Sequence, residues 1–159
     1  MAKLNMRCSM NYTRLEELRD ELGFTKKEMA MELGISDSMY GRWENDRTII
    51  PTRRLYQLGN YFQVNIDYLL KFSDLRQQIV SPDQLDSIKV SARVREIRKE
   101  LHYTLRELSA NLNTSSSTWS AYETGKVLIL SAFLLQICQE GNFSIDWVLG
   151  RSEVKYRKK

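Results

Sequence analysis

Few residues of this 159-residue chain could support covalent or metal chemistry. His102 is the only histidine, and neither Cys8 nor Cys138 has another cysteine or a histidine nearby in the sequence. A zinc site needs several closely spaced Cys or His ligands, and a catalytic nucleophile needs an adjacent base. We therefore expect no metal and no cofactor, and an enzyme is the least expected class of protein. The sparse cysteines fit a reducing compartment.

The chain instead contains an internal repeat, with two copies of one sequence segment. Residues 14–71 and 93–150 align without a gap at an offset of 79 residues, which is the separation of Thr25 from Thr104. Solenoid repeats usually have shorter periods and at least three copies, so this repeat predicts two globular domains. The predicted division is a first domain over 1–72, a linker over 73–90, a second domain over 91–150 and a basic tail over 151–159.

Composition favours helices. The chain has only 2 Pro and 7 Gly among many Leu, Glu, Lys and Arg residues, and it lacks the alternation typical of strands. The predicted class is all-α. Domains of about 60 residues lie near the lower limit of independent stability, so we expect contacts between the repeats to stabilise both.

Two capping boxes predict helix starts in the first repeat. In this motif a Thr side chain accepts from a free helix amide, and a Glu three residues later reaches back. The spacing occurs at Thr13 with Glu16 and at Thr25 with Glu28, and again at Thr104 with Glu107 in the second repeat. The first predicted helix covers 14–22 and ends at Gly23. Three leucines share its inner face: Leu15, Leu18 and Leu22.

A tight turn then joins the second predicted helix to a third. Gly34 breaks the second helix, and Ser36 is a good N-cap for a third helix over 37–44. In the second repeat Asn113 replaces Gly34, and asparagine is the best non-glycine residue for a left-handed turn. Ser115 replaces Ser36. The resulting pattern is helix, tight turn, helix.

Each third helix carries two aromatic residues spaced three apart. Tyr40 and Trp43 become Trp119 and Tyr122 in the second repeat. That spacing puts both rings on one helical face beside an apolar second helix. We expect these aromatics in the core, and stacking on nucleic-acid bases is the minor interpretation.

These residues resemble the helix-turn-helix domain of phage repressors and Cro proteins, also called the xenobiotic-response-element family. The resemblance covers both repeats and rests in the first on Arg19, Gly23, Thr25, Glu28, Ala30, Leu33, Gly34, Ser36, Trp43, Glu44, Asn45, Leu58 and residues 64–70. It implies two tandem five-helix, lambda-repressor-like domains. Ser81 followed by Pro82 reads as a helix start, so the linker between them is predicted to be partly helical.

The resemblance also implies a structural ion pair in each repeat. An Arg of the first helix pairs with a Glu that ends the third, which here joins Arg19 to Glu44 and Arg98 to Glu123. Such a pair fixes how the third helix leaves the domain. Removal of one partner would cost about 3–5 kcal/mol if the pair is buried.

In this family the third helix meets base edges in the major groove, while the second helix and the turn hold the DNA backbone. The matching base-contact residues are Asp37, Ser38 and Arg42. Arg42 is the strongest candidate because arginine is the usual bidentate reader of guanine. The candidates for phosphate contacts in the first repeat are Lys26, Lys27, Asn45 and Arg47. A merely solvated face is the alternative.

The second repeat differs from this pattern at the candidate DNA-contact positions. Lys26 becomes Leu105, and Arg42 becomes Ala121. The remaining candidates for DNA contact are Arg106, Ser116, Ser117 and Lys126. Whether this repeat reads DNA specifically is open, because its electrostatic affinity should be lower.

An apolar stretch in the second repeat replaces a polar one in the first. The replacing residues are Leu128, Ile129, Leu130 and Phe133, and they exceed what so small a core should need. They predict an interface with the first repeat or with a second chain, and a better-filled local core is the alternative. The basic tail, with Lys155, Arg157, Lys158 and Lys159, is either a DNA contact or a solubilising end.

The leading hypothesis is a bacterial or phage transcription regulator, most simply a repressor, that binds a specific double-stranded DNA operator as a homodimer or an intramolecular pseudo-dimer. The alternative is a protein-interaction module, such as an antitoxin or adaptor, that retains the fold. The net charge of +4 does not decide between them, since both repeats are nearly neutral. The longest apolar run, over 127–130, is far too short to cross a bilayer, so we expect a soluble cytoplasmic protein with no membrane partner.

Overall fold

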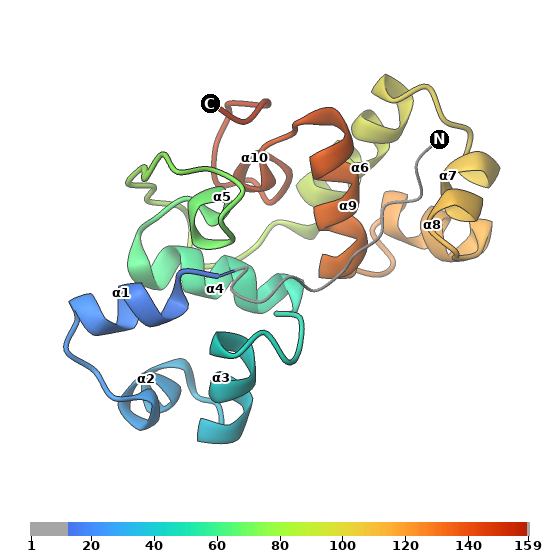
Figure 1. Ribbon diagram of the computed structural model, residues 1–159. Helices are drawn as coiled ribbons and strands as arrows, with labels where there is room; N and C mark the ends of the chain where they lie inside the picture. Colours follow the sequence, from blue (N-terminus) through green and yellow to red (C-terminus); the bar gives the residue numbers. More distant parts are fainter. Residues whose placement is uncertain (1–12, 159) are drawn as a thin grey trace.

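The computed structural model describes residues 13–158, which form ten helices (Figure 1). Among these residues the only β pairing consists of two isolated bridges, Val64 with Gln78 and Phe143 with Tyr156. The all-α class and the two tandem five-helix units are confirmed. Cys8, Lys159 and the first 12 residues of the predicted first domain lie outside the described residues.

The two repeats contain equivalent helices. The first repeat consists of α1 (Leu15–Glu21), α2 (Lys26–Leu33), α3 (Asp37–Glu44), α4 (Thr52–Phe62) and α5 (Ile66–Leu69). The second consists of α6 (Ser87–Glu100), α7 (Leu105–Asn111), α8 (Ser116–Glu123), α9 (Ser131–Gly141) and α10 (Ile145–Val148). In both repeats the second and third helices form the helix-turn-helix.

The capping boxes that start α2 and α7 are confirmed, with both reciprocal hydrogen bonds present. The predicted box at Thr13 and Glu16 is wrong, because Arg14 is the N-cap of α1 and makes no side-chain cap bond. The inward position predicted for Leu22 is also wrong. This residue is 47% exposed, because α1 ends at Glu21 and Leu22 is already turning away as the C-cap.

The predicted turns adopt the left-handed backbone that their residues favour. Gly23 has φ of 70° and Gly34 has φ of 67°. Their counterparts His102 and Asn113 have φ of 62° and 54°. The only histidine of the chain therefore occupies a helix-ending turn.

The linker adheres to the first repeat. The carbonyl of Pro82 accepts from the Tyr56 hydroxyl at 2.6 Å and from the Asn60 amide at 3.0 Å. The helix start predicted at Ser81 is wrong, because α6 begins at Ser87 with Asp86 as its cap. The Ser81 hydroxyl instead bonds to Asn60. The last residues of the predicted linker are helical, as part of α6.

Each repeat buries its aromatic pair. Tyr40 and Trp43 are 0% and 2% exposed, and Trp119 and Tyr122 are 0% and 4% exposed. The rings of each pair meet edge to face, with centroids 6.4 and 5.6 Å apart. The prediction of core aromatics is confirmed, and these rings are not available for base stacking.

The two repeats meet through α5 and α10 by a reciprocal contact. The carboxylate of Asp146 accepts from the backbone amide of Ile66 at 2.8 Å, so it caps the start of α5. Asp67, at the equivalent position of the first repeat, accepts from the amide of Ile145 at 3.3 Å and from the Ser144 hydroxyl at 3.0 Å. Equivalent residues that exchange equivalent contacts define a pseudo-two-fold axis between the repeats.

Two arginines from the C-terminal segment neutralise this carboxylate pair. The Arg151 side chain is 0% exposed, pairs with Asp146 and donates to the carbonyl of Val64 at 2.9 Å. Arg157 donates to Asp67 at 3.2 Å and lies over the Phe72 ring. The segment predicted as a basic tail therefore packs across both repeats.

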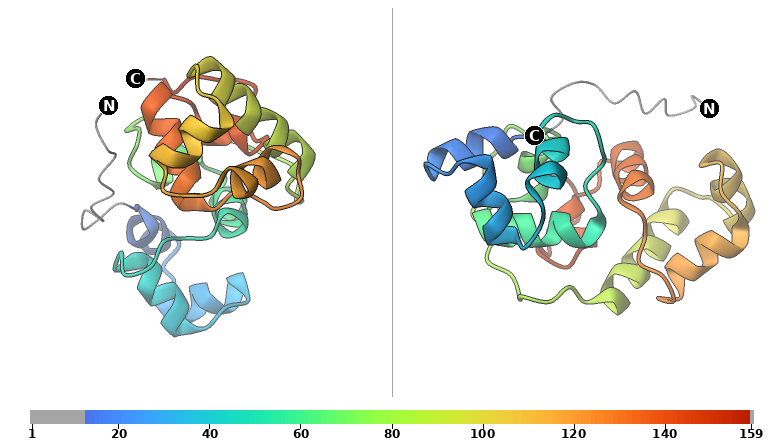
Figure 2. Two further views of the ribbon diagram at one scale, coloured as in Figure 1. Left: turned by 90° about the vertical axis from the view of Figure 1, so that its right-hand side faces the viewer. Right: turned by 90° about the horizontal axis from the view of Figure 1, so that it is seen from below.

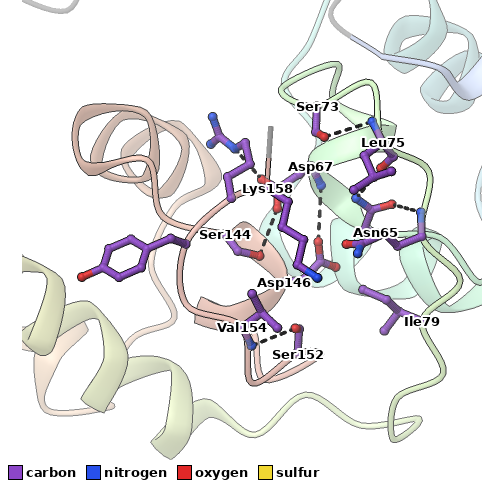
Figure 3. A pocket seen from close by; sticks show the side chains of 13 residues that line it. Asn65, Asp67, Ser73, Leu75, Ile79, Ser144, Asp146, Ser152, Val154 and Lys158 are labelled. Carbon is purple, nitrogen blue, oxygen red and sulfur yellow. Dashed lines mark hydrogen bonds and ion pairs between the residues drawn. The ribbon is translucent and has the colours of Figure 1, made fainter.

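The charged cluster encloses almost no free volume. Figure 3 shows Asp67, Ser144 and Asp146 facing one another between the two repeats. The cavity beside them measures about 20 Å³, which is too small for an organic ligand. This part of the structure is a joint between domains.

Substitution of Asp146 by Asn should destabilise the protein by about 3–5 kcal/mol, because the fully buried Arg151 would lose its counter-charge. Chemical denaturation measures the change in the free energy of unfolding. Asp74→Asn is the control, since that carboxylate is fully exposed and water and salt screen its pair with Arg14. Equal effects of the two substitutions would contradict the assignment of the joint.

The joint should also respond to pH. Burial raises the pKa of Asp67 from 3.8 to about 6, and the neighbouring Asp146 adds to the rise. A group whose folded pKa lies above its unfolded pKa binds its proton more tightly in the native state, so its contribution to stability grows as pH falls from about 7 to about 4. The unfolding free energy of the wild type, relative to Asp67→Asn, should rise by about 2 kcal/mol over that range. Parallel pH profiles of the two proteins would refute this expectation.

Candidate nucleic-acid interface

The candidate base-contact residues lie on the exposed face of α3. Asp37, Ser38 and Arg42 are all exposed, whereas Tyr40 and Trp43 on the opposite face are buried. Ser36 begins the helix by accepting a hydrogen bond from the amide of Met39 at 3.1 Å. The local sequence thus produces a short helix with one face in the core and one polar face free for a ligand.

The candidate phosphate contacts surround this face. Lys26 and Lys27 stand at the start of α2, and Asn45 and Arg47 follow α3 directly. All four are exposed. Side chains at these places can reach a DNA backbone on either side of the groove that α3 would enter.

An ion pair fixes the exit of α3 from the domain. The Arg19 guanidinium donates to Glu44 at 2.6 Å and to the carbonyl of Phe24 at 2.7 Å. The Glu44 side chain is 1% exposed, and its contact raises the pKa of Arg19. Arg98 and Glu123 repeat the pair at 2.6 Å in the second repeat.

Lys26 also lies near this carboxylate, with its ammonium 3.7 Å from Glu44. Its side chain is 45% exposed, so the ammonium can still turn toward an anionic ligand. Lys27 is the less encumbered of the two lysines among the contacts that the structure records. A phosphate bound here would compete with a buried glutamate for Lys26.

Met39 was not among the predicted contacts, yet the structure exposes 45% of it on the first turn of α3. An apolar side chain in the major groove can contact the methyl group of thymine. The sequence offered no clear signal for this exposure, because Met39 stands four residues before the buried Trp43, a spacing that also fits a core position. Thr118 occupies the equivalent position in the second repeat.

The polar face of α8 is chemically different. Its serines form hydrogen bonds with neighbouring hydroxyl groups. The Oγ atoms of Ser116 and Ser109 are 3.1 Å apart, and the Oγ atoms of Ser117 and Ser115 are also 3.1 Å apart. No cationic side chain occurs along α8 itself (Ser116–Glu123), and the exposed Arg106 and Lys126 flank it. This face offers hydroxyl groups where α3 offers a guanidinium.

The four apolar residues that predicted an interface separate into three environments. Ile129 is 2% exposed, and its carbonyl accepts from the Thr52 hydroxyl of the first repeat at 2.6 Å. Phe133 packs on the Trp119 and Tyr122 rings of its own repeat, and Leu128 is partly buried. Leu130 is 57% exposed.

The helix-turn-helix elements occupy opposite ends of the molecule. In Figures 1 and 2, α2 and α3 lie at one end and α7 and α8 at the other, with α4, α5, α9 and α10 between them. The reciprocal contacts of Asp67 and Asp146 relate the two ends by the pseudo-two-fold axis. Two such units related by a two-fold axis are the arrangement that matches successive major grooves of one duplex.

Sequence reasoning missed the residues that join the repeats. Asp67 and Asp146 appeared only as part of the family pattern, and Arg151 only as part of a basic tail. The available signal was an identical Asp directly after an identical Ile in both repeats. Across residues 13–158, no helix is long and apolar enough to cross a membrane, and no cluster of His, Cys, Asp and Glu could hold a metal ion.

Comparisons with known proteins agree with the presence of two helix-turn-helix domains in this chain. The helix-turn-helix domain family matches residues 12–74 and again residues 92–153. The transcriptional regulator ImmR of Bacillus subtilis (strain 168) is 39% identical over 57 residues, which is 36% of this chain and 45% of ImmR. The chain thus spans less than half the length of that relative.

A second relative aligns over both repeats. The uncharacterized helix-turn-helix-type transcriptional regulator YobD, also of Bacillus subtilis (strain 168), is 28% identical over 111 residues, which is 63% of this chain and 96% of YobD. No solved structure matches this chain significantly. With both of its repeats matched, the chain belongs to the phage repressor and Cro-type family of helix-turn-helix transcription regulators.

Proposed function

We propose that this protein binds one specific operator in double-stranded DNA as a single chain and represses transcription by occupying it. The observation that carries the proposal is the pseudo-two-fold pairing of two helix-turn-helix units within one polypeptide. All ten helices of the described residues belong to these two units. Occupation of the operator is therefore the mechanism that the described part of the chain can perform by itself.

The two units contribute unequally in this proposal. The first reads bases through Arg42, Ser38 and Asp37, with Lys26, Lys27, Asn45 and Arg47 on phosphates. The second anchors the chain through Arg106 and Lys126 and contacts the duplex through the hydroxyls of Ser116 and Ser117. Because phosphate contacts carry little sequence information, the second half-site should be the less strongly specified.

In this proposal the two repeats of one chain pair with each other, so the protein needs no second chain to bind the operator. An intramolecular pseudo-dimer holds both units at high effective concentration, so specific binding does not require a second copy. The operator then has two unlike half-sites with centres about 34 Å apart, or one helical turn. A homodimer would instead select a palindrome.

Replacement of Arg42 by Ala should weaken binding to the selected operator by about tenfold to a hundredfold, because a bidentate contact contributes about 1–3 kcal/mol of discrimination. Electrophoretic mobility shift or fluorescence anisotropy at fixed salt gives the dissociation constant. Arg95→Ala on the exposed surface of α6 is the charge-matched control and should leave specific binding almost unchanged. If Arg42→Ala binds the operator as tightly as the wild type, α3 is not the reading helix.

Selection from random duplex DNA with the purified chain should enrich an asymmetric motif, with one well-defined and one weaker half-site. Sedimentation of the complex should give one chain for each duplex. An enriched palindrome with two chains bound would replace the pseudo-dimer by a homodimer. Absence of any enriched motif, with weak binding that disappears at high salt, would overturn the regulator proposal itself.

A further inference from the structure

The two arginines of the joint both come from the second repeat. Asp67 and Asp146 are equivalent residues, one from each repeat, yet Arg157 pairs with the first and Arg151 with the second. The first repeat has Phe72 at the place of Arg151. The backbone amides of these two residues make the equivalent hydrogen bond, to the carbonyls of Asp67 and Asp146, at 2.8 and 2.7 Å. The joint is therefore symmetric in its carboxylates and asymmetric in its cations.

The place of Arg157 is also uncharged in the first repeat. The backbone amide of Arg157 donates to the carbonyl of Asn142 at 2.9 Å, and the amide of Ile79 donates to the carbonyl of Gln63 at 3.2 Å. Gln63 and Asn142 are equivalent under the offset of 79, so Ile79 occupies the place of Arg157. The first repeat thus gives the joint a carboxylate and no cation from either position.

The first repeat instead provides the space that Arg151 needs. A Cβ atom on Gly59 would lie 2.8 Å from the Cζ atom of Arg151, closer than van der Waals contact allows. The guanidinium cannot move aside without loss, because it is fully buried and donates to the carbonyl of Val64 at 2.9 Å. Cys138 is the residue equivalent to Gly59. Under the pseudo-two-fold relation, it stands where an arginine at position 72 would need the same space.

Charge and space distinguish three possible pairings of these repeats. The observed pairing of unlike repeats combines two carboxylates with two guanidinium groups. Two first repeats would bury two carboxylates with no guanidinium from these positions. Two second repeats would combine two carboxylates with four guanidinium groups, and each Arg151 would meet Cys138 where it now meets Gly59. Because buried charges are costly unless they are paired, only the unlike pairing is balanced.

We propose that the joint selects unlike repeats, so that the first repeat binds a surface with a guanidinium at the position of Arg151 and rejects a second copy of itself. The carboxylate caps are common to both repeats and permit pairing, whereas the differences at positions 59/138 and 72/151 make it selective. A chain with this joint keeps its own second repeat in the presence of other copies. Selection of this kind does not depend on DNA binding, so it holds or fails independently of the proposed function.

The test moves the arginine from one repeat to the other in the full chain. In F72R/R151F both like pairings become balanced. The introduced arginine of each first repeat would face Gly59 of another copy, and two second repeats would hold their two carboxylates with their two Arg157 side chains. Pairing within one chain becomes unfavourable, because the introduced arginine would meet Cys138. Sedimentation velocity over a range of concentrations measures the number of chains, and circular dichroism follows folding and thermal unfolding.

The wild type should sediment as one chain and F72R/R151F as two or more. The opposite half of the exchange, G59C/C138G, moves only the space and should lower the unfolding midpoint by about 5 °C or more. The four-residue variant G59C/F72R/C138G/R151F moves the arginine together with its space, so it should return to one chain with a midpoint close to that of the wild type. L75R/R95F is the control, because it makes the same exchange of residue types at two exposed positions and should remain one chain.

Two results would overturn the proposal. One is a folded F72R/R151F that remains a single chain with the midpoint of the wild type. The other is a four-residue variant that is no more stable than either half of the exchange. If F72R/R151F does not fold, the four-residue variant decides alone: a folded single chain supports selection by these positions, and an unfolded chain refutes it.

Discussion

The arrangement of the molecule depends on two carboxylates that cap helices of the opposite repeat. Asp146 caps α5 and Asp67 caps α10, and each is matched by an arginine from the C-terminal segment. Burial of these charges is costly unless they are paired, so the paired contacts favour the observed placement of the repeats. The cluster thereby defines the joint as a specific orientation, where a purely apolar contact would tolerate sliding.

That orientation gives α3 and α8 a fixed relation within one chain. A regulator that associates through separate copies depends on its concentration, whereas here the second unit is always present. Because the units need not be identical, the second can carry Ala121 where the first carries Arg42, and it exposes Val127 and Leu130. Duplication with divergence is thus visible in the geometry as well as in the sequence.

Local features were predicted well because local forces decide them. The capping boxes at Thr25 and Thr104, the left-handed turns and the buried aromatic pairs depend on residues within one or two helical turns. The errors at Thr13 and Leu22 occurred at the ends of α1, where packing against the rest of the domain outweighs a spacing rule. The helix start predicted at Ser81 failed similarly, because the Pro82 carbonyl accepts hydrogen bonds from Tyr56 and Asn60 instead.

The sequence by itself determined the all-α class, the duplication and the family of this protein, since these follow from periodicity, caps and a repeated pattern. Only the tertiary structure decided that Asp67 and Asp146 hold the repeats together and that the C-terminal cations act inside the molecule. The physical reason is that a charge is ordinarily a surface feature. Its burial becomes favourable only when partners from distant parts of the chain, here residues 60–67 and 144–157, converge on it.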